Sequence, residues 1–173
     1  MLSQNVQKAI NEQIKREAYS SNLYLAMASW VQVNGYAGSA DFLYVQAEEE
    51  RIHMLKLFKY INDREGFAEV SELEKPPREF TSLKSVFEEV LKHEKYISKS
   101  INDLVGVCYD ERDFTTVNFL QWYVNEQIEE EANAKTILDR LELLGNDKSQ
   151  LYIFDRDIVT IRQQTAAAAN KTV

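Results

Sequence analysis

The segment GFAEVSELEKPPREFTS, residues 66–82, decides the fold of this chain. It is the only irregular stretch of any length between long helical patterns, and it holds both prolines, Pro76 and Pro77. A partly extended chain covers roughly 3.3 Å per residue, so the segment reaches about 50 Å, whereas a helix of about 27 residues is about 40 Å long. The connector can therefore run the length of a helical bundle, which lets the helices on either side of it lie parallel.

Helical periodicity fills the chain on both sides of this connector. Only 5 glycines and 2 prolines occur among 173 residues, so there are few places where a regular element ends. Short turns at 34–35 and 110–113 make each flanking pair of helices antiparallel. The sequence predicts one all-α domain, residues 1–173: a four-helix bundle over about 5–144, with a long crossover between helices two and three, then a short fifth helix and a flexible tail, 165–173. The predicted helices are 5–33, 40–64, 83–109, 114–144 and 147–164.

Composition and charge exclude several classes of function. With 45% hydrophobic and 28% charged residues the chain fits a globular domain with a core. The net charge of -8, without a basic run, argues against a nucleic-acid partner and favours cations. Cys108 alone cannot form an internal disulfide, the first residues lack the apolar stretch of a secretory signal, and no run approaches the roughly 18 apolar residues that span a bilayer. We expect a cytoplasmic protein with no membrane partner.

Four acids lie in the middle of apolar helical stripes, where aliphatic side chains are expected at about 100° per residue. Unpaired carboxylates in a core cost several kcal/mol each, and no Lys or Arg on these stripes neutralises them. Multivalent cations would do so, and Glu with His is the ligand set of iron sites in helical bundles. Glu50 and His53 have the i, i+3 spacing that puts both side chains on one face. The four acids, one in each helix, are Glu17, Glu50, Glu94 and Glu130.

The order and spacing of these residues resemble the bacterial non-haem ferritins. The resemblance covers almost the whole chain, and it includes Glu-x-x-His at 50–53 and WYVNEQIEE at 122–130. It implies a ferritin-like bundle that oxidises Fe(II) at an intrasubunit diiron ferroxidase centre, with dioxygen or hydrogen peroxide, and stores ferric oxyhydroxide mineral inside an oligomeric shell. One iron would be held by Glu17, Glu50 and His53. The other would be held by Glu50, Glu94 and Glu130.

The same resemblance implies further roles around this centre. Gln127 would lie beside the two irons, and Tyr24 would supply an electron close to them. Arg51 stands where a bacterioferritin would offer a haem-ligating methionine, so we expect no haem. From the helical wheel alone, an exposed acidic face is equally consistent with the acids of the fourth helix. The resemblance instead implies a third iron site nearby, with Glu49, Glu126 and Glu129.

Apolar side chains outside the main stripes indicate contacts between subunits. On the first helix these side chains are Leu23, Met27 and Val31. The fifth helix lies outside a completed bundle and should also need a partner for its apolar surface. The resemblance to ferritins implies a homo-oligomer of 24 subunits. The apolar residues of the fifth helix are Leu151, Ile153, Phe154, Ile158 and Ile161.

Three residues near the predicted site receive simpler interpretations. His93 neighbours Glu94 but points about 100° away from it, so we expect a surface or interface histidine. Glu48 falls off the buried face, which indicates a solvated charge. Cys108 lies on the apolar stripe of its helix and is expected to be a buried small hydrophobe.

Other functions fit part of the pattern. A diiron oxidase or peroxide-consuming enzyme could use the same bundle without retaining iron, but such proteins generally carry two histidines at the centre. Here Ile97 and Asn133 stand where a second histidine would lie. A non-catalytic scaffold with structural inward acids is a further alternative. DNA-protecting miniferritins fit less well, because their sites lie between subunits and their bundles lack the fifth helix.

Overall fold

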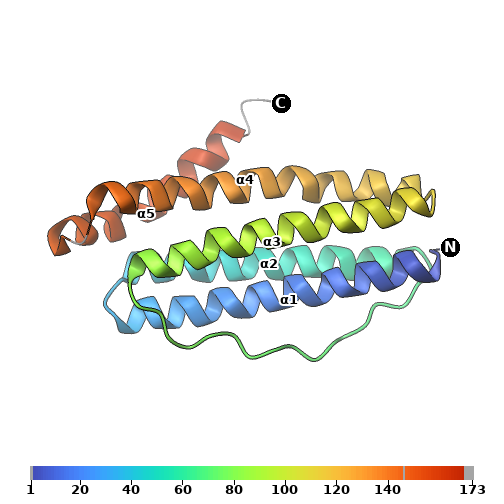
Figure 1. Ribbon diagram of the computed structural model, residues 1–173, viewed down its shortest axis with the longest axis horizontal. Coiled ribbons are helices and arrows are strands. Elements are labelled where there is room, and N and C mark those ends of the chain that lie inside the picture. Colours follow the sequence, from blue (N-terminus) through green and yellow to red (C-terminus); the bar gives the residue numbers. More distant parts are fainter. Residues whose placement is uncertain (1, 146, 170–173) are drawn as a thin grey trace.

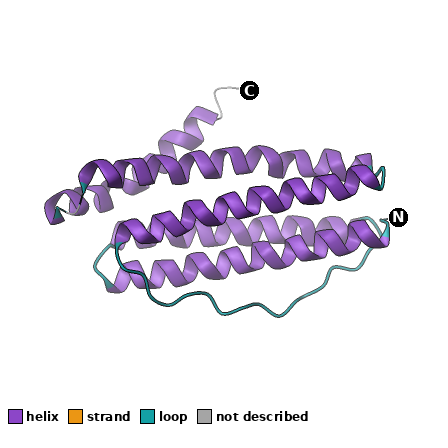
Figure 2. Ribbon diagram, viewed as in Figure 1, coloured by secondary structure: helices purple, strands orange, loops and turns teal. Residues whose placement is uncertain are grey.

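A computed structural model of the chain describes residues 2–145 and 147–169. The regular elements of this part are all helices (Figure 2), and each predicted helix is present. The fifth helix continues to Ala169 where the sequence predicted an end at Gln164, because a run of alanines has the highest helix propensity. Residues 170–173 of the predicted tail lie outside the described residues. The helices are α1 (Gln4–Val33), α2 (Ala37–Asp63), α3 (Leu83–Asp110), α4 (Phe114–Leu144) and α5 (Lys148–Ala169).

The first four helices form a bundle of two antiparallel pairs, α1 with α2 and α3 with α4 (Figure 1). The connector between α2 and α3 runs along the outside of the bundle, beside α1, from one end to the other. As a result α2 and α3 run parallel, which confirms the predicted crossover. Within the described residues, no helix is long and apolar enough to cross a membrane.

Side-chain amides hold the start of the crossover against the bundle. Nδ2 of Asn11 donates to the carbonyl oxygen of Phe67 at 3.0 Å, and the backbone N–H of Glu69 donates to Oδ1 of Asn11 at 2.9 Å. Gln7 accepts a third hydrogen bond from the N–H of Phe67 at 3.1 Å. These bonds satisfy backbone groups that a loop without a ladder would otherwise leave to water. The start of the crossover is therefore fixed by α1.

The core consists of two apolar clusters with a polar layer between them. One cluster contains Leu23, Leu43 and Val90, and the other contains Ile14, Leu57 and Ile97. On each of the first three helices, the acid found by sequence lies between a residue of one cluster and a residue of the other. The bundle thus places these acids at one level along its axis, where apolar packing excludes water on both sides.

The structure corrects the expected role of three apolar residues on α1. Leu23, Met27 and Val31 are buried inside the subunit itself, within the first apolar cluster. A bundle helix touches two neighbours, and α1 packs on both α2 and α3, so its buried arc is wider than one stripe. These residues therefore need no second subunit to cover them.

Helix α5 also finds its partner within the subunit. Phe154 and Ile158 are buried, and the ring of Phe154 meets that of Phe87 on α3 edge to face at 6.2 Å between centroids. The prediction that these residues need another chain was wrong, because α5 packs against α2 and α4. Ile153 is 43% exposed, and the side chain of Ile161 lies outside the described part.

A buried carboxylate locks α5 onto the start of α2. Asp155 accepts hydrogen bonds from the backbone N–H groups of Gly38, at 3.0 Å, and of Ser39, at 2.8 Å. The hydroxyl of Ser39 donates to the same carboxylate at 2.7 Å. An anion is favoured at a helix N-terminus, where N–H groups lack partners within the helix. A Cβ on Gly38 would lie 1.8 Å from the carbonyl oxygen of Asp155, so only glycine permits this approach.

Candidate metal centre

Three side chains from α1 and α2 form a compact group inside the bundle. Glu17 comes from α1, while Glu50 and His53 lie one turn apart on α2. All three are buried, and one possible ligand atom of each lies within 4.8 Å of the others. Nδ1 of His53 is 3.8 Å from Oε2 of Glu50. Across residues 2–145 and the described part of α5, no other group of three acid, histidine or cysteine side chains is as compact.

Helices α3 and α4 add two more buried carboxylates to the same interior. Glu94 accepts hydrogen bonds from the hydroxyl of Tyr24 and, at 3.0 Å, from Nε2 of Gln127. Glu130 accepts one from Nε2 of Gln46 at 3.0 Å. Burial first, and then the charge of Glu94, raises the pKa values of Glu130 and of both acids in the compact group. The four carboxylates therefore share one electrostatic environment.

Two of the carboxylate oxygens lack a hydrogen-bond partner. They are Oε2 of Glu17 and Oε2 of Glu50, both buried, and no described residue donates to either one. The other oxygen of Glu17 accepts a hydrogen bond from Nε2 of Gln13 at 2.8 Å. A buried acceptor without a donor costs about 1–3 kcal/mol, and a bound cation would remove this cost for both oxygens. The donor set of the group, two carboxylates and an imidazole, fits iron.

Burial shifts the pKa values of the acids and of the histidine in opposite directions. Desolvation raises the pKa of Glu17 to about 7 and that of Glu130 to about 8. It also raises the pKa values of Glu50 and Glu94. Desolvation lowers the pKa of His53 to about 4, so near neutral pH the imidazole is uncharged and can act as a ligand. A cation that binds here would displace protons from the acids.

Comparison with known proteins agrees with this geometry. Residues 7–144 match the family model described as Ferritin-like domain. The chain belongs to the ferritin family. Family membership confirms the resemblance that the order of acids and histidine indicated, and with it the predicted bundle with a crossover and a C-terminal helix.

Several ferritins are similar over nearly the full chain. A probable bacterial non-heme ferritin-like protein of Haemophilus influenzae is 49% identical over 91% of this chain and 96% of its own length. A bacterial non-heme ferritin of Campylobacter jejuni is 45% identical over 93% of this chain and 96% of its own. Among solved structures, an open pore ferritin from Archaeoglobus fulgidus has a TM-score of 0.90 at 41% identity, covering 91% of this chain and 96% of its own.

The three acids assigned by resemblance to a third iron site are not part of the compact group of this ferritin. Glu126 and Glu49 are half-buried and Glu129 is exposed. Burial first, and then the charge of Glu129, raises the pKa of Glu126. In the part of the chain that is described, the three do not form a compact group of ligand atoms. The structure thus brings Glu17, Glu50 and His53 together closely and leaves these acids more open.

Sequence reasoning missed the glutamines that position the acids. Gln13 precedes Glu17 by four residues and donates to it, and Gln46 precedes Glu50 by four and donates across the bundle to Glu130. Residues four apart lie on the same helix face. A polar amide one turn before Glu17 and one turn before Glu50 is therefore a signal that the sequence did contain.

Two aromatic residues of α4, Trp122 and Tyr123, pack against His53. Tyr123 donates its hydroxyl to the backbone oxygen of His53 at 2.8 Å, and the ring of Trp122 meets the imidazole edge to face at 5.2 Å. Nζ of Lys56 lies 3.2 Å from the centroid of Trp122. Burial lowers the pKa of Lys56, and the charge of Glu126 offsets part of this shift. The ring of Trp122 packs on His53 but stays 37% exposed.

His93 is a correction to the sequence analysis. We expected a surface or interface histidine, but the side chain is 7% exposed and its Nε2 lies 2.7 Å from Oγ of Ser20 on α1. The 100° turn away from Glu94 points the ring toward α1, which packs on that face of α3, rather than into solvent. Cys108 is buried and Glu48 is exposed, as predicted.

Proposed function

We propose that this ferritin oxidises Fe(II) at the buried centre, with dioxygen or hydrogen peroxide as oxidant, and stores the product as ferric oxyhydroxide. The observation that carries the proposal is the compact group of Glu17, Glu50 and His53, with two buried oxygens that no described donor satisfies. Carboxylate oxygens are hard, anionic ligands, so they stabilise Fe(III) relative to Fe(II) and favour the oxidation.

Two irons are proposed to bind in each subunit. The first is held by Glu17, Glu50 and His53, and the second by Glu50 together with Glu94 and Glu130. The shared electrostatic environment of the carboxylates supports this assignment. Gln127 acts beside them by donating its amide hydrogen to Glu94, which fixes the orientation of that carboxylate.

A third iron position and an electron donor complete the proposed site. The third position uses Glu49, Glu126 and Glu129, which lie more exposed than the centre and would pass ferric ions onward. Tyr24 donates its hydroxyl to Glu94. This bond supports a role in which Tyr24 supplies an electron, because Glu94 can hold the proton that the phenol releases.

The container is proposed to be a homo-oligomer of 24 subunits in the cytoplasm, without haem. The similarity to an open pore ferritin over 91% of the chain supports an assembled shell. The free, buried Cys108 is consistent with a reducing compartment. Arg51, which stands at the position of the haem-ligating methionine in bacterioferritins, supports the absence of haem.

Aerobic addition of Fe(II) to metal-free protein tests the proposal. Tens to hundreds of irons per chain are added, and iron and protein are detected together after size exclusion. We expect iron to elute with a very large assembly, and we expect the fast oxidation phase to be lost in Glu50→Ala and His53→Ala. Glu48→Ala is the matched control, because Glu48 is an exposed acid two residues from Glu50. About two irons per chain on a small oligomer would indicate a diiron enzyme without a store.

A further inference from the structure

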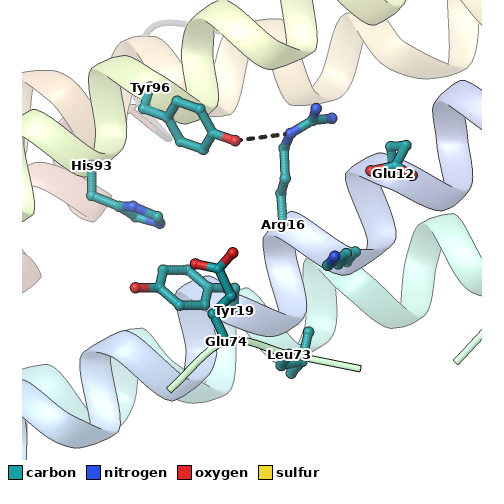
Figure 3. A pocket seen from close by; sticks show the side chains of 8 residues that line it. Glu12, Arg16, Tyr19, Leu73, Glu74, His93 and Tyr96 are labelled. Atoms are coloured by element: carbon teal, nitrogen blue, oxygen red, sulfur yellow. Dashed lines mark hydrogen bonds between the residues drawn. The ribbon is translucent and has the colours of Figure 1, made fainter. Parts of the chain in front are cut away.

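A surface pocket of about 350 Å³ lies between α1, α3 and the crossover, outside the proposed iron site. Tyr19 and Arg16 reach it from α1, His93 and Tyr96 from α3, and Glu74 from the crossover (Figure 3). The rings of Tyr19 and His93 point toward each other across the space between the two helices. The proposed function assigns no role to this pocket.

His93 connects the pocket to the interior. Its ring lies 6.0 Å from that of Tyr19 and 6.5 Å from that of Tyr24, measured between centroids. Tyr24 in turn donates its hydroxyl to Glu94 of the proposed iron site. The contact between Nε2 of His93 and Oγ of Ser20 fixes the imidazole in this position. Three rings in sequence thus join an open pocket to a carboxylate of the centre.

We propose that this pocket is where a small one-electron donor of the enediol or hydroquinone class returns the electron that Tyr24 gives to the iron site. Tyr19 is the outer step and His93 is the bridge between the two tyrosines. The inference rests on the proposed function, because it requires Tyr24 to act as an electron donor. It adds a binding site for a soluble reductant on the outside of the bundle.

The first step balances with hydrogen peroxide as oxidant. Peroxide takes up two electrons and two protons to give two waters. One ferrous ion supplies one electron and becomes ferric, and Tyr24 supplies the other and becomes a tyrosyl radical. The phenol proton of Tyr24 passes to Glu94, which already accepts its hydrogen bond. Because Glu94 keeps the proton of Tyr24, the reduction of peroxide takes up two protons from solvent.

The second step restores Tyr24 and consumes the soluble donor. An electron moves from Tyr19 to the Tyr24 radical across His93, and Glu94 returns the proton to Tyr24. Tyr19 releases its own proton to solvent and becomes the radical. The donor in the pocket then gives one hydrogen atom to Tyr19 and leaves as a donor radical.

Charge distinguishes Tyr19 from the other tyrosine of the pocket. The ring of Tyr96 also lies 6.0 Å from that of His93, but its oxygen accepts a hydrogen bond from Nε of Arg16 at 3.1 Å. Burial, followed by the charges of Glu74 and Glu89, raises the pKa of Tyr19. Negative charge stabilises a ring that has lost an electron, and a cation on the phenol oxygen opposes the loss. Tyr19, and not Tyr96, is therefore the residue that passes an electron to the Tyr24 radical.

Freeze-quenched electron paramagnetic resonance tests the proposal on the assembled protein. Protein with less ferrous iron than its sites can bind is mixed with hydrogen peroxide, and the tyrosyl signal is followed with and without ascorbate as the probe. We expect the signal in the unaltered protein and not in Tyr24→Phe. In Tyr19→Phe we expect ascorbate to quench the signal about tenfold more slowly, which corresponds to a barrier higher by about 1.4 kcal/mol. Tyr96→Phe, the matched control from the same pocket, should quench at the original rate.

Two outcomes overturn the inference while leaving the proposed oxidation and storage of iron intact. One is normal iron oxidation without a tyrosyl signal, which also removes the proposed electron-donor role of Tyr24. The other is an equal rate of ascorbate quenching in Tyr19→Phe and the unaltered protein. Failure of iron oxidation in the unaltered protein would instead remove the proposed function.

Discussion

Replacing Glu17 by glutamine should stabilise the metal-free protein while it weakens iron binding. In the absence of metal, Oε2 of Glu17 is buried without a donor, and desolvation raises the pKa of the carboxyl from 4.5 to about 7. Glutamine has the same shape but carries no charge, and it can still accept the hydrogen bond from Gln13. The substitution therefore removes the cost of burying a charge without opening a cavity.

The size and sign of this effect follow from the pKa values of Glu17 in the two states. Because the folded-state pKa is raised, the contribution of Glu17 to stability is fully present below pH 4.5 and is lost as the pH rises through about 7. Raising a pKa from 4.5 to about 7 corresponds to at most about 3 kcal/mol. For a chain of this length that difference is worth about 6–12 °C in Tm.

Thermal unfolding of metal-free protein, followed by circular dichroism between pH 4 and pH 8, measures the effect. Glu17→Gln and the unaltered protein should have similar Tm values at pH 4, and the variant should be higher by several degrees at pH 8. Glu12→Gln is the control, since Glu12 is an exposed acid on the same helix. A Tm difference between Glu17→Gln and the unaltered protein that does not change with pH would refute the reasoning.

Three further predictions concern contacts around the bundle. Asp155→Ala removes the acceptor of three hydrogen bonds from the start of α2. A hydrogen bond to a charged group stabilises a fold by about 1.5–3 kcal/mol, so the rate of backbone hydrogen exchange in α5 should rise by at least about tenfold. Asn11→Ala frees two backbone groups of the crossover, and limited proteolysis should cut residues 66–82 faster, without change in α3. Lys56→Met removes a cation 3.2 Å from the centroid of Trp122, so it should change the fluorescence of that side chain and strengthen Tb³⁺ binding at Glu126.

The acids of the centre could be predicted from sequence because they interrupt a regular pattern. Glu17, Glu50 and Glu94 each stand between apolar residues on one helix face, and no Lys or Arg on that face neutralises them. The structure places each between the two apolar clusters, at one level of the bundle. The crossover could be predicted for a similar reason, since the length of residues 66–82 matches the length of a helix. Both inferences depend on local sequence and on the dimensions of a helix.

Residues that face a second neighbour could not be assigned in the same way. The wheel of α1 places Met27 and Val31 away from the central stripe, yet both are buried because α1 touches α2 and α3 at once. His93 was misassigned for the same reason, since the side of α3 that turns away from Glu94 faces α1. A helical wheel gives the direction of each side chain but not the number of helices packed around it.

Contacts between distant segments were outside the reach of sequence reasoning. Nothing in the pattern of α5 indicates that Asp155 caps α2, because the acid looks like a surface charge on its own helix. Asn11 likewise resembles a polar residue on the exposed side of α1, although it holds the crossover. Each of these polar side chains is explained by hydrogen bonds to groups more than fifty residues away in the chain.

The stability of the metal-free protein and its affinity for metal both depend on the ionisation of the same buried acids. Near neutral pH the empty centre is partly protonated, since the pKa of Glu17 is about 7 and that of Glu130 is about 8. Rising pH removes these protons and leaves buried charges that destabilise the metal-free fold, and the same charges are the ligands that a cation neutralises. Over the pH range in which the metal-free protein loses stability, its affinity for metal should therefore increase. A metal ion that binds only the folded state then stabilises that state. The two apolar clusters, one on each side of the acids, keep the bundle folded when no ion is bound.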